Sequence, residues 1–181
     1  VASPSVSMVS FTGSSITGTK IMEASAPKLS QVALELGGKS AMVIFADTEI
    51  ERAVEATIKG CLTNGGQICT AHTRLIVQEG IKDDLLKKLK KTLEKIPYCR
   101  DPITERERGD RAWETGMTDV IQPVVSASQH EKIVGFLNEA KATGIEIYTG
   151  GEVPDPADLE NSGGYFIQPT ILTNVPSDSD A

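Results

Sequence analysis

Met8-Val9-Ser10-Phe11-Thr12-Gly13-Ser14-Ser15-Ile16-Thr17-Gly18 is the stretch that decides the fold class of this chain. Its first residues alternate apolar and polar side chains, as a short strand does, and a glycine–serine turn follows directly. The next residues predict a helix that begins near Ser14 or Ser15 as its N-cap. Helical spacing places four residues along one edge of this helix, which is expected to be its apolar edge: Ile16, Lys20, Ile21 and Ala24. A strand, a turn and a helix in immediate succession indicate an α/β fold.

The turn between this strand and this helix has the parts of an anion-binding site. Unpaired N–H groups and the positive end of the helix dipole point toward whatever binds there. Gly13 lets the backbone approach a phosphate, Ser14 can add a hydroxyl hydrogen bond, and Gly18 permits close packing of helix on strand. The alternative is an ordinary strand–helix connection that needs these residues only for turn geometry. Two glycines without the complete dinucleotide fingerprint leave both interpretations open.

A second strand is expected from Leu29 to Leu36, with alternate apolar residues on one face. Glu35 faces the other way or lies at the strand end, and Gly37-Gly38 then breaks the strand. A carboxylate in this position can reach into a cleft, where desolvation raises the pKa of a glutamate toward the range of a general base. The alternative is an exposed acid at a strand end, which is the usual place of a glutamate.

A further strand and helix are expected next. Met42 to Phe45 is uniformly apolar, which favours a strand covered on both faces. Thr48 and Glu51 have capping-box spacing, so a helix is expected to begin there and to end at Asn64-Gly65-Gly66. Six residues at helical spacing form its expected core face: Ile50, Ala53, Val54, Thr57, Ile58 and Cys61. The Cys61 thiol is therefore predicted to be structural.

Cys69 has a different setting, because it follows two glycines in a loop between that helix and a strand expected from Thr73 to Gln78. Glycines allow positive φ or a close approach to a ligand, and a thiol on such a loop is a candidate nucleophile. The alternative is that Gly65-Gly66 merely ends the helix and that Cys69 is a small buried hydrophobe.

Composition excludes several classes of function. The chain has 181 residues, of which 39% are hydrophobic and 24% charged, as in soluble globular proteins. A formal net charge of −7 argues against a nucleic-acid partner or an anionic membrane surface. No apolar run is long enough to span a bilayer, and no signal-peptide pattern is visible. Three irregularly spaced cysteines favour a reducing compartment, either cytoplasmic or organellar.

The rest of the chain reads as scaffold. An apolar edge from Ile81 to Ile96 predicts a helix whose lysines face solvent, and the pattern breaks between Pro97 and Pro123. Ser128 and Glu131 have capping-box spacing and open a helix that Gly144 ends. Three strands are expected after it: Ile145 to Tyr148, Tyr165 to Ile167, and Thr170 to Leu172. Cys99 receives no role.

Three motifs, in this order and at this spacing, resemble those of the aldehyde dehydrogenase superfamily: Phe11-Thr12-Gly13-Ser14 with Gly18, Leu34-Glu35-Leu36-Gly37-Gly38-Lys39, and Gly66-Gln67-Ile68-Cys69 with Arg74. The surrounding residues, and also Gly163-Gly164-Tyr165-Phe166 and Gln168-Pro169-Thr170, most resemble the betaine and amino-aldehyde dehydrogenase branch. The resemblance covers nearly the whole chain as an interior portion of a family member. It fails from Arg111 to Met117, which looks like an insertion and holds the only tryptophan.

The resemblance implies an aldehyde dehydrogenase-like α/β fold. Residues 1–36 are expected to form the C-terminal part of a Rossmann-like NAD(P)-binding domain, and residues 37–181 an incomplete catalytic domain. It also implies NAD- or NADP-dependent oxidation of a small aldehyde, in which Cys69 forms a thiohemiacetal and then a thioester, and Glu35 activates the hydrolytic water. Leu36 and Gly37 would border the nicotinamide, while Gly13 and Ser14 would face the pyrophosphate beside Gly18. The Cys69 N–H would form half of an oxyanion hole.

Other parts of the family's machinery are expected outside this chain. An oxyanion asparagine, a coenzyme-binding lysine and an acidic residue that helps to choose NAD over NADP precede Val1 in the family, and a ribose-binding glutamate follows Ala181. We therefore expect the isolated chain to be inactive. The resemblance implies that the full-length protein is a homodimer or homotetramer.

Four alternatives remain at this stage. Cys69 and His72 could form a hydrolase pair, but the two side chains of a strand start would point to different sides. Cys61, Cys69 and His72 lack paired zinc-ligand spacing, so no metal is expected. The chain could also be a non-catalytic relative that keeps the fold. A CoA-acylating dehydrogenase is the fourth, and Glu35 argues against it because a hydrolytic base serves only when water is the acceptor.

Overall fold

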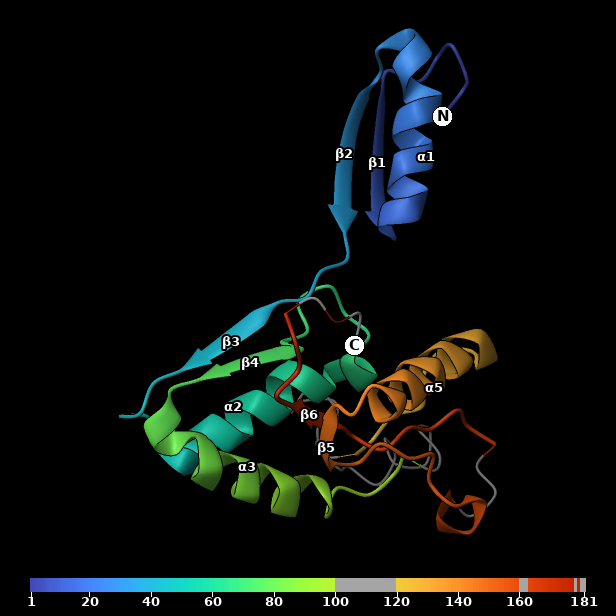
Figure 1. The fold of residues 1–181 in the computed structure, drawn as a ribbon. Coiled ribbons are helices and arrows are strands. Elements are labelled where there is room, and N and C mark those ends of the chain that lie inside the picture. The colour runs from blue at the N-terminus through green and yellow to red at the C-terminus, as the bar shows by residue number, and fades with distance from the viewer. Residues whose placement is uncertain (100–119, 160–162, 178, 180–181) are drawn as a thin grey trace, which may run out of the picture.

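The computed structural model describes residues 1–99, 120–159, 163–177 and 179. Within them the strands form three two-stranded sheets, each accompanied by at least one helix, so the expected α/β architecture is present (Figure 1). No helix in this part of the chain is both long and apolar enough to cross a membrane.

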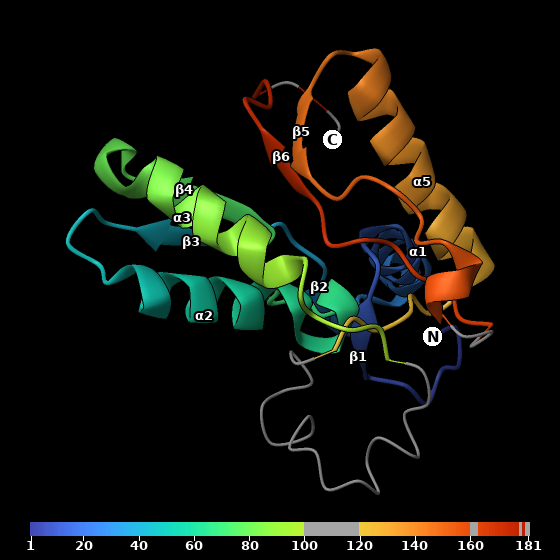
Figure 2. The same ribbon diagram turned by 90° about the horizontal axis from the view of Figure 1, so that it is seen from below.

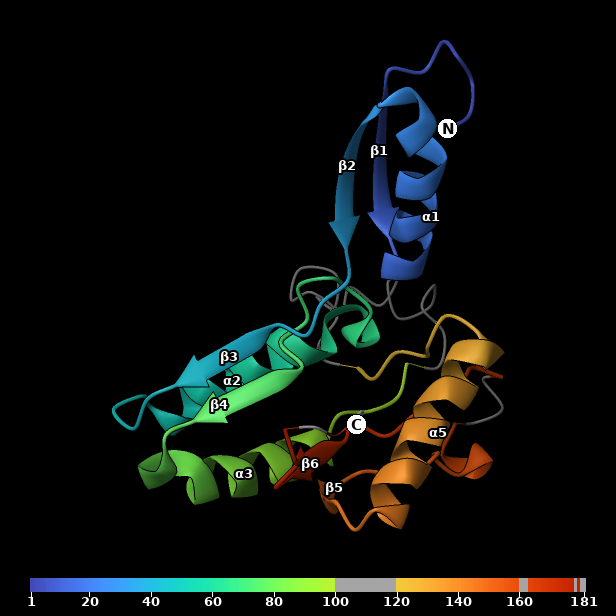
Figure 3. The ribbon, with the colours of Figure 1, turned by 45° about the horizontal axis from the view of Figure 1, so that its top comes forward.

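The first unit is a parallel strand–helix–strand arrangement, and it extends away from the rest of the chain (Figures 1 and 3). Its elements are β1 (Met8–Gly13), α1 (Ser15–Ser25), the short 3-10 helix η1 (Ala26–Lys28) and β2 (Gln31–Leu36). The expected N-cap is confirmed, because the Ser14 side chain accepts a hydrogen bond from the Thr17 N–H at 3.2 Å. The predicted division of the chain after residue 36 stays a prediction, and β2 ends at that residue.

The second unit repeats this arrangement and adds a helix. Its elements are β3 (Ala41–Ile44), α2 (Ile50–Leu62), the 3-10 helix η2 (Thr63–Gly66), β4 (Arg74–Val77) and α3 (Glu79–Leu93). β3 and β4 pair in parallel, and α2 and α3 lie side by side against them (Figures 1 and 2). Their shared core consists of Ile44, Ala53, Val54, Ile81, Leu85 and Leu89. The predicted core face of α2 is thus confirmed, and so is the predicted apolar edge of α3 from Ile81 to Leu89. Ile96 of that edge lies beyond the end of α3 and packs against another cluster.

The third unit lies beside the second. It contains α5 (Ala127–Ala142), β5 (Glu146–Thr149), the 3-10 helix η4 (Pro156–Leu159) and β6 (Ile171–Thr173). β5 and β6 pair in antiparallel fashion, and Ile171 packs against the core of the second unit. A smaller cluster of Ile121, Leu159 and Phe166 covers the chain that leads into α5. Gly144 ends α5 in the left-handed conformation at φ 75°, as expected.

Two expectations about the first unit are wrong. Ile16 of the predicted apolar edge is 74% exposed, and α1 instead buries Gly18 and Ser25. A Cβ on Gly18 would lie 3.0 Å from a methyl carbon of Leu36, so the helix approaches the sheet through its smallest residue. Leu29 is not part of β2, because it takes a left-handed conformation at φ 54° that closes η1.

The second unit corrects two further expectations. β3 forms where Met42 to Phe45 predicted a strand, but Val43 and Phe45 are 55% and 63% exposed, so only one face of the strand is covered. The capping box at Thr48 is absent as well. The Thr48 N–H closes a turn onto the Phe45 carbonyl, and Glu49 becomes the N-cap without a side-chain hydrogen bond.

Two expectations about the third unit also fail. The N-cap of α5 is Ser126, which accepts from the Gln129 N–H at 3.2 Å, so the helix begins before the predicted box at Ser128. No strand forms from Tyr165 to Ile167. In that stretch the Tyr165 carbonyl accepts one backbone hydrogen bond, from the Val124 N–H. The segment from Arg111 to Met117 lies outside the described residues.

Candidate functional site

The loop that carries Cys69 begins with three consecutive left-handed residues. Asn64, Gly65 and Gly66 have φ of 55°, 62° and 73°, a conformation in which glycine and asparagine are the least strained residues. A Cβ on Gly66 would lie 3.0 Å from the Cys61 carbonyl oxygen, so this glycine is also required for a close approach. The chain thereby turns sharply off the end of α2 and leaves Cys69 exposed.

The far end of the loop is fixed to the sheet. Ala71 is 4% exposed, and its N–H donates to the Ile68 carbonyl at 3.2 Å. The His72 N–H donates to the Gly60 carbonyl at 2.9 Å, which ties the loop back onto α2. The Arg74 side chain then donates a hydrogen bond to the Lys39 carbonyl at 2.7 Å, in the segment that follows β2. Cys69 therefore lies on a short exposed span between two anchored ends.

The other two thiols are withdrawn from solvent. Cys61 lies against the loop and its thiol donates to the His72 carbonyl at 2.7 Å, while burial raises the pKa of that thiol. Cys99 is 4% exposed. A thiol with a raised pKa is a poor nucleophile, because only the thiolate attacks. Cys69 is the exposed thiol of the three, as the loop context predicted.

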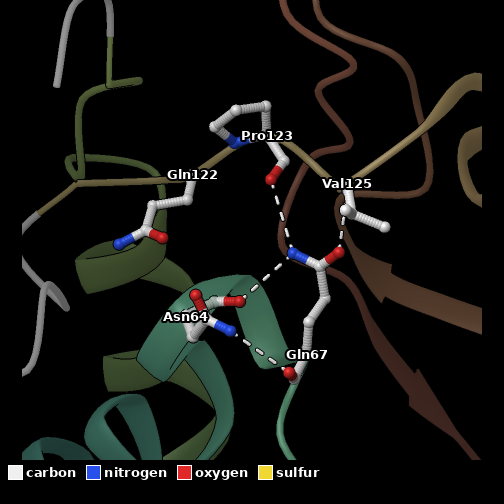
Figure 4. A pocket seen from close by; sticks show the side chains of 5 residues that line it. All are labelled: Asn64, Gln67, Gln122, Pro123 and Val125. Carbon is white, nitrogen blue, oxygen red and sulfur yellow. Dashed lines mark hydrogen bonds between the residues drawn. The ribbon is translucent and has the colours of Figure 1, made fainter.

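Gln67, two residues before Cys69, lines a shallow hollow of about 390 Å³ with Asn64, Gln122, Pro123 and Val125 (Figure 4). Its carboxamide oxygen accepts the Val125 N–H at 2.8 Å, and its nitrogen donates to the Asn64 and Pro123 carbonyls at 3.2 and 3.4 Å. The sequence motif Gly66-Gln67-Ile68-Cys69 indicates no separate role for Gln67. The hydrogen bonds of Gln67 to Pro123 and Val125 join residues that are 56 and 58 positions apart, and no local sequence pattern indicates such bonds.

Glu35 and the glycine–serine turn meet at one edge of the first sheet. In the parallel register of β1 and β2, Thr12 lies opposite Glu35 and Gly13 lies opposite Leu36. The carboxyl ends of the two strands therefore place the candidate base, the candidate phosphate turn and Leu36 side by side. Glu35 is exposed, and Gly37 has open space around it.

The Cys69 loop lies on the side of the second unit that faces this edge (Figures 1 and 3). The link after Leu36 runs directly to Lys39 and Ser40, whose carbonyls bond Arg74. Among the described residues, however, no hydrogen bond or ion pair joins Glu35 to Cys69. The fold brings Glu35 together with Gly13 and Ser14, and it places Cys69 on a separate, facing loop.

The hydrolase and metal alternatives gain nothing from this geometry. The His72 ring packs over Gly60, and its Nδ1 atom is buried without a partner in the described part of the chain. No hydrogen bond there joins it to Cys69. No group of histidine, cysteine or acidic side chains that could hold a metal ion occurs among residues 1–99, 120–159 and 163–177.

Comparison with known proteins identifies the family of this chain. The model of the family described as "Aldehyde dehydrogenase family" matches residues 1–181. The chain is 42% identical to the peroxisomal aminoaldehyde dehydrogenase 2 of Pisum sativum over 172 residues, which cover 95% of the chain and 31% of that protein. It is 40% identical to the chloroplastic betaine aldehyde dehydrogenase of Amaranthus hypochondriacus, with the same coverage. The chain thus spans about a third of the length of these relatives.

Solved structures agree on the fold. The betaine aldehyde dehydrogenase of Staphylococcus aureus, crystallised in complex with NAD+, matches with a TM-score of 0.78 at 35% identity, over 94% of this chain and 31% of that one. The lactaldehyde dehydrogenase of Escherichia coli matches with a TM-score of 0.78 at 29% identity, over 98% and 33%. The aldehyde dehydrogenase-like α/β fold expected from the three motifs is confirmed.

Proposed function

This chain belongs to the aldehyde dehydrogenase family, and on that premise we propose that the protein oxidises an aldehyde to a carboxylic acid with NAD+ or NADP+, with Cys69 as nucleophile. The observation that carries the proposal is the contrast among the thiols. Cys69 is exposed on a loop that begins with left-handed residues, whereas Cys61 is partly buried and Cys99 is buried.

Two atoms of Cys69 have parts in this reaction. Its thiolate adds to the carbonyl carbon of the aldehyde, which forms a carbon–sulfur bond and leaves negative charge on the oxygen. In the described chain the Cys69 N–H donates to no acceptor, so it is free to stabilise that oxyanion. Removal of one such donor elsewhere lowers kcat by about 10²- to 10³-fold. When the oxidised centre has become a thioester, Cys69 is the leaving group.

The first unit fits a dinucleotide at its glycine–serine turn. Ser14 already satisfies two N–H groups at the start of α1. Its side chain accepts a hydrogen bond from the Thr17 N–H, and its carbonyl accepts one from the Gly18 N–H. The N–H groups of Ser15 and Ile16 donate to no acceptor in the described chain and remain for phosphate oxygens. A Cβ on Gly13 would overlap with the Phe11 ring, so glycine keeps this approach open. Bound NAD(P)+ supplies a hydride acceptor, and Leu36 and Gly37 would border it.

Glu35 is the proposed general base of the last step. Its carboxylate takes a proton from the water that attacks the thioester, which releases the acid and regenerates Cys69. Glu35 takes the exposed strand-end position rather than a desolvated one, and what supports the role is access, because a water molecule can reach the carboxylate. This role also separates the proposal from a CoA-acylating enzyme, in which a thiol replaces water.

For the substrate we propose an amino- or betaine-type aldehyde, on the ground of the names of the relatives. A homodimer or homotetramer is proposed for the complete protein on the family resemblance alone. A panel of aminoaldehydes, betaine aldehyde and neutral aldehydes of equal chain length tests the substrate. A kcat/KM for neutral aldehydes equal to that for the cationic ones would remove the substrate assignment and leave the reaction untouched.

Substitutions in the complete protein test the mechanism. Cys69→Ala is expected to abolish NAD(P)-dependent oxidation, and the matched variant Cys61→Ala is expected to retain it. Glu35→Gln is expected to form an acyl-enzyme that accumulates on Cys69 and is visible by intact mass. Iodoacetamide is expected to alkylate Cys69 faster than Cys61 or Cys99, since burial raises the pKa of the Cys61 thiol. Equal, slow labelling of all three thiols would favour the non-catalytic alternative.

A further inference from the structure

We propose that Gln67 is a positioning residue for Cys69: its carboxamide fastens the cysteine loop to residues 123–125 and so sets where the thiol and the N–H of Cys69 stand. This inference rests on the function proposed above, because positioning matters only if Cys69 is the nucleophile. It concerns a residue of the loop that the chemistry itself does not use.

The loop needs an external attachment because its turn is built from residues that hold it only weakly. Asn64 is a non-glycine residue in the left-handed region, and two glycines follow it there. Glycines lose more conformational freedom on folding than any other residue, so this turn is a weak anchor by itself. Two reciprocal bonds brace it: the Asn64 side chain donates to the Gln67 carbonyl at 3.1 Å, and the Gln67 side chain donates to the Asn64 carbonyl at 3.2 Å.

The same carboxamide then reaches a segment that is remote in sequence. The Val125 N–H can only donate, so the Gln67 atom 2.8 Å from it must be the oxygen, which fixes the orientation of the amide. The nitrogen consequently faces the Pro123 carbonyl at 3.4 Å, a longer and weaker bond. A carbonyl and an N–H two residues apart are the pair that a neighbouring strand bonds, so the side chain takes the place of a strand (Figure 4).

The segment that receives Gln67 is itself held from the other side. The intervening Val124 N–H donates to the Tyr165 carbonyl at 2.8 Å, and Val124 is 9% exposed. Phe166, next to Tyr165, is 2% exposed in the smaller cluster. Gln67 thus connects the cysteine loop to a packed part of the third unit.

This connection is the last one before the reactive residue. On the N-terminal side the nearest anchored residue is Gln67, and on the C-terminal side it is the buried Ala71. Ile68, Cys69 and Thr70 between them are exposed. Without the Gln67 side chain, the N-terminal end of this short span would keep only the left-handed turn and the two bonds that the Gln67 backbone makes with Asn64, and it would lose its tie to residues 123–125. A displacement of about 1 Å can cost about 10²-fold in rate.

The test is Gln67→Met in the complete protein. It keeps the length of the side chain and removes its hydrogen bonds. We expect kcat, normalised to the amount of Cys69 that iodoacetamide labels, to fall between about 10- and about 100-fold with the KM for NAD(P)+ unchanged. Amide hydrogen exchange gives a direct readout: Val125 should lose protection, while Val124, bonded to Tyr165, should keep it.

Gln78→Met is the matched control. Gln78 also accepts a backbone N–H with its side chain, from Ala46 at 2.8 Å, but at the opposite end of β4 from the Cys69 loop. A comparable fall in melting temperature without a fall in normalised kcat is expected for this variant. If the two variants have the same normalised kcat, Gln67 is merely structural and the proposal is overturned.

Gln67→Glu keeps the proposal testable if Gln67→Met does not fold. It preserves the acceptor for Val125 and replaces the donor by an oxygen that faces two carbonyls, so normalised kcat should fall while Val125 stays protected. A normalised kcat equal to that of the wild type in this variant would contradict the positioning role of Gln67. The two proposals fail separately: activity in Cys69→Ala removes the nucleophile, whereas an inactive Cys69→Ala with normal Gln67 variants removes only the positioning role.

Discussion

The two strand–helix–strand units of the chain use similar local patterns and reach different degrees of burial. In the second unit, α2 and α3 enclose a core in which Leu85 and Leu89 are 0% and 1% exposed. In the first unit, α1 buries only Gly18 and Ser25, and Met22 is 57% exposed. Both units place a loop of the candidate site beyond a helix or strand end.

The hydrophobic pattern of a segment therefore specifies which helix or strand it forms, but not how that element packs. A segment of helical spacing becomes a helix in both units, with a side-chain cap at Ser14 in α1 and without one in α2, because propensity is local. Burial of its apolar side chains needs a second layer, which α3 provides for α2 and which nothing in the described chain provides for the outer side of α1. Substitutions at matched places in the two units should therefore have very different costs.

The largest expected effect is at the centre of the second unit. Leu85→Ala removes a fully buried side chain between two helices and leaves a cavity, which should lower the free energy of unfolding by about 2 to 5 kcal/mol. Urea unfolding measures this, with the partly exposed Leu86 replaced in the same way as the control. A loss below about 1 kcal/mol would show that the core of this unit is not the one described.

Next in size is a substitution at the closest contact of the first unit. Gly18→Val adds a branched side chain where even a Cβ would lie 3.0 Å from Leu36. We expect a loss of about 1 to 3 kcal/mol from overpacking, measured by thermal unfolding. Gly135→Val in α5 is the control, since nothing lies within 4 Å of a Cβ there. Equal costs at the two sites would mean that α1 does not rest on β2 through Gly18.

Much of the fold could be predicted from local chemistry. The strands β1, β3 and β4 and the helices α2 and α3 follow from periodicity, and the N-cap of α1 follows from the position of Ser14. The errors arose at helix starts, where neighbouring residues compete for the cap, and where a strand needs a distant partner. Thr48 and Ser128 have capping spacing, yet the helices begin elsewhere. Tyr165 to Ile167 has the pattern of a strand, and no strand of the described residues pairs with it.

The candidate site divides in the same way. Cys69 could be found from its glycines, whereas the adjacency of Glu35 to Gly13 became visible only in the parallel register of β1 and β2. The tie through Gln67 could not be found, because it joins residues more than fifty positions apart through a side chain. The exposed state of Glu35 was one of two alternatives that the sequence left open, since strand alternation says which face a residue takes and not what covers that face.

A smaller effect is expected on the outer side of α1. Ile16→Ser exchanges residues of similar helix propensity at a site that is 74% exposed, so the free energy of unfolding should change by no more than about 0.5 kcal/mol. Ile81→Ser in α3, where the side chain is 6% exposed, is the matched change and should cost several times more. A large cost at Ile16 in the complete protein would show that another part of that protein covers α1.

The smallest effect concerns the ion pair between the two helices of the second unit. Lys88 donates to Glu51 at 3.1 Å, and this hydrogen bond, together with the charge of Lys88, lowers the pKa of the Glu51 carboxyl below its ordinary value. A carboxyl whose pKa is lowered in the folded state favours folding above its unfolded pKa, and this contribution is lost as the pH falls through the folded pKa. Lys88→Met should therefore raise the pKa of Glu51, as seen by NMR titration of the carboxyl carbon. Because both side chains are largely exposed, at 46% and 74%, solvent screens the pair and stability at neutral pH should scarcely change. A marked loss of stability at neutral pH would show that this pair holds α2 and α3 together in a way that burial of Leu85 and Leu89 does not explain. An unchanged Glu51 pKa would show instead that Lys88 does not pair with Glu51 in solution.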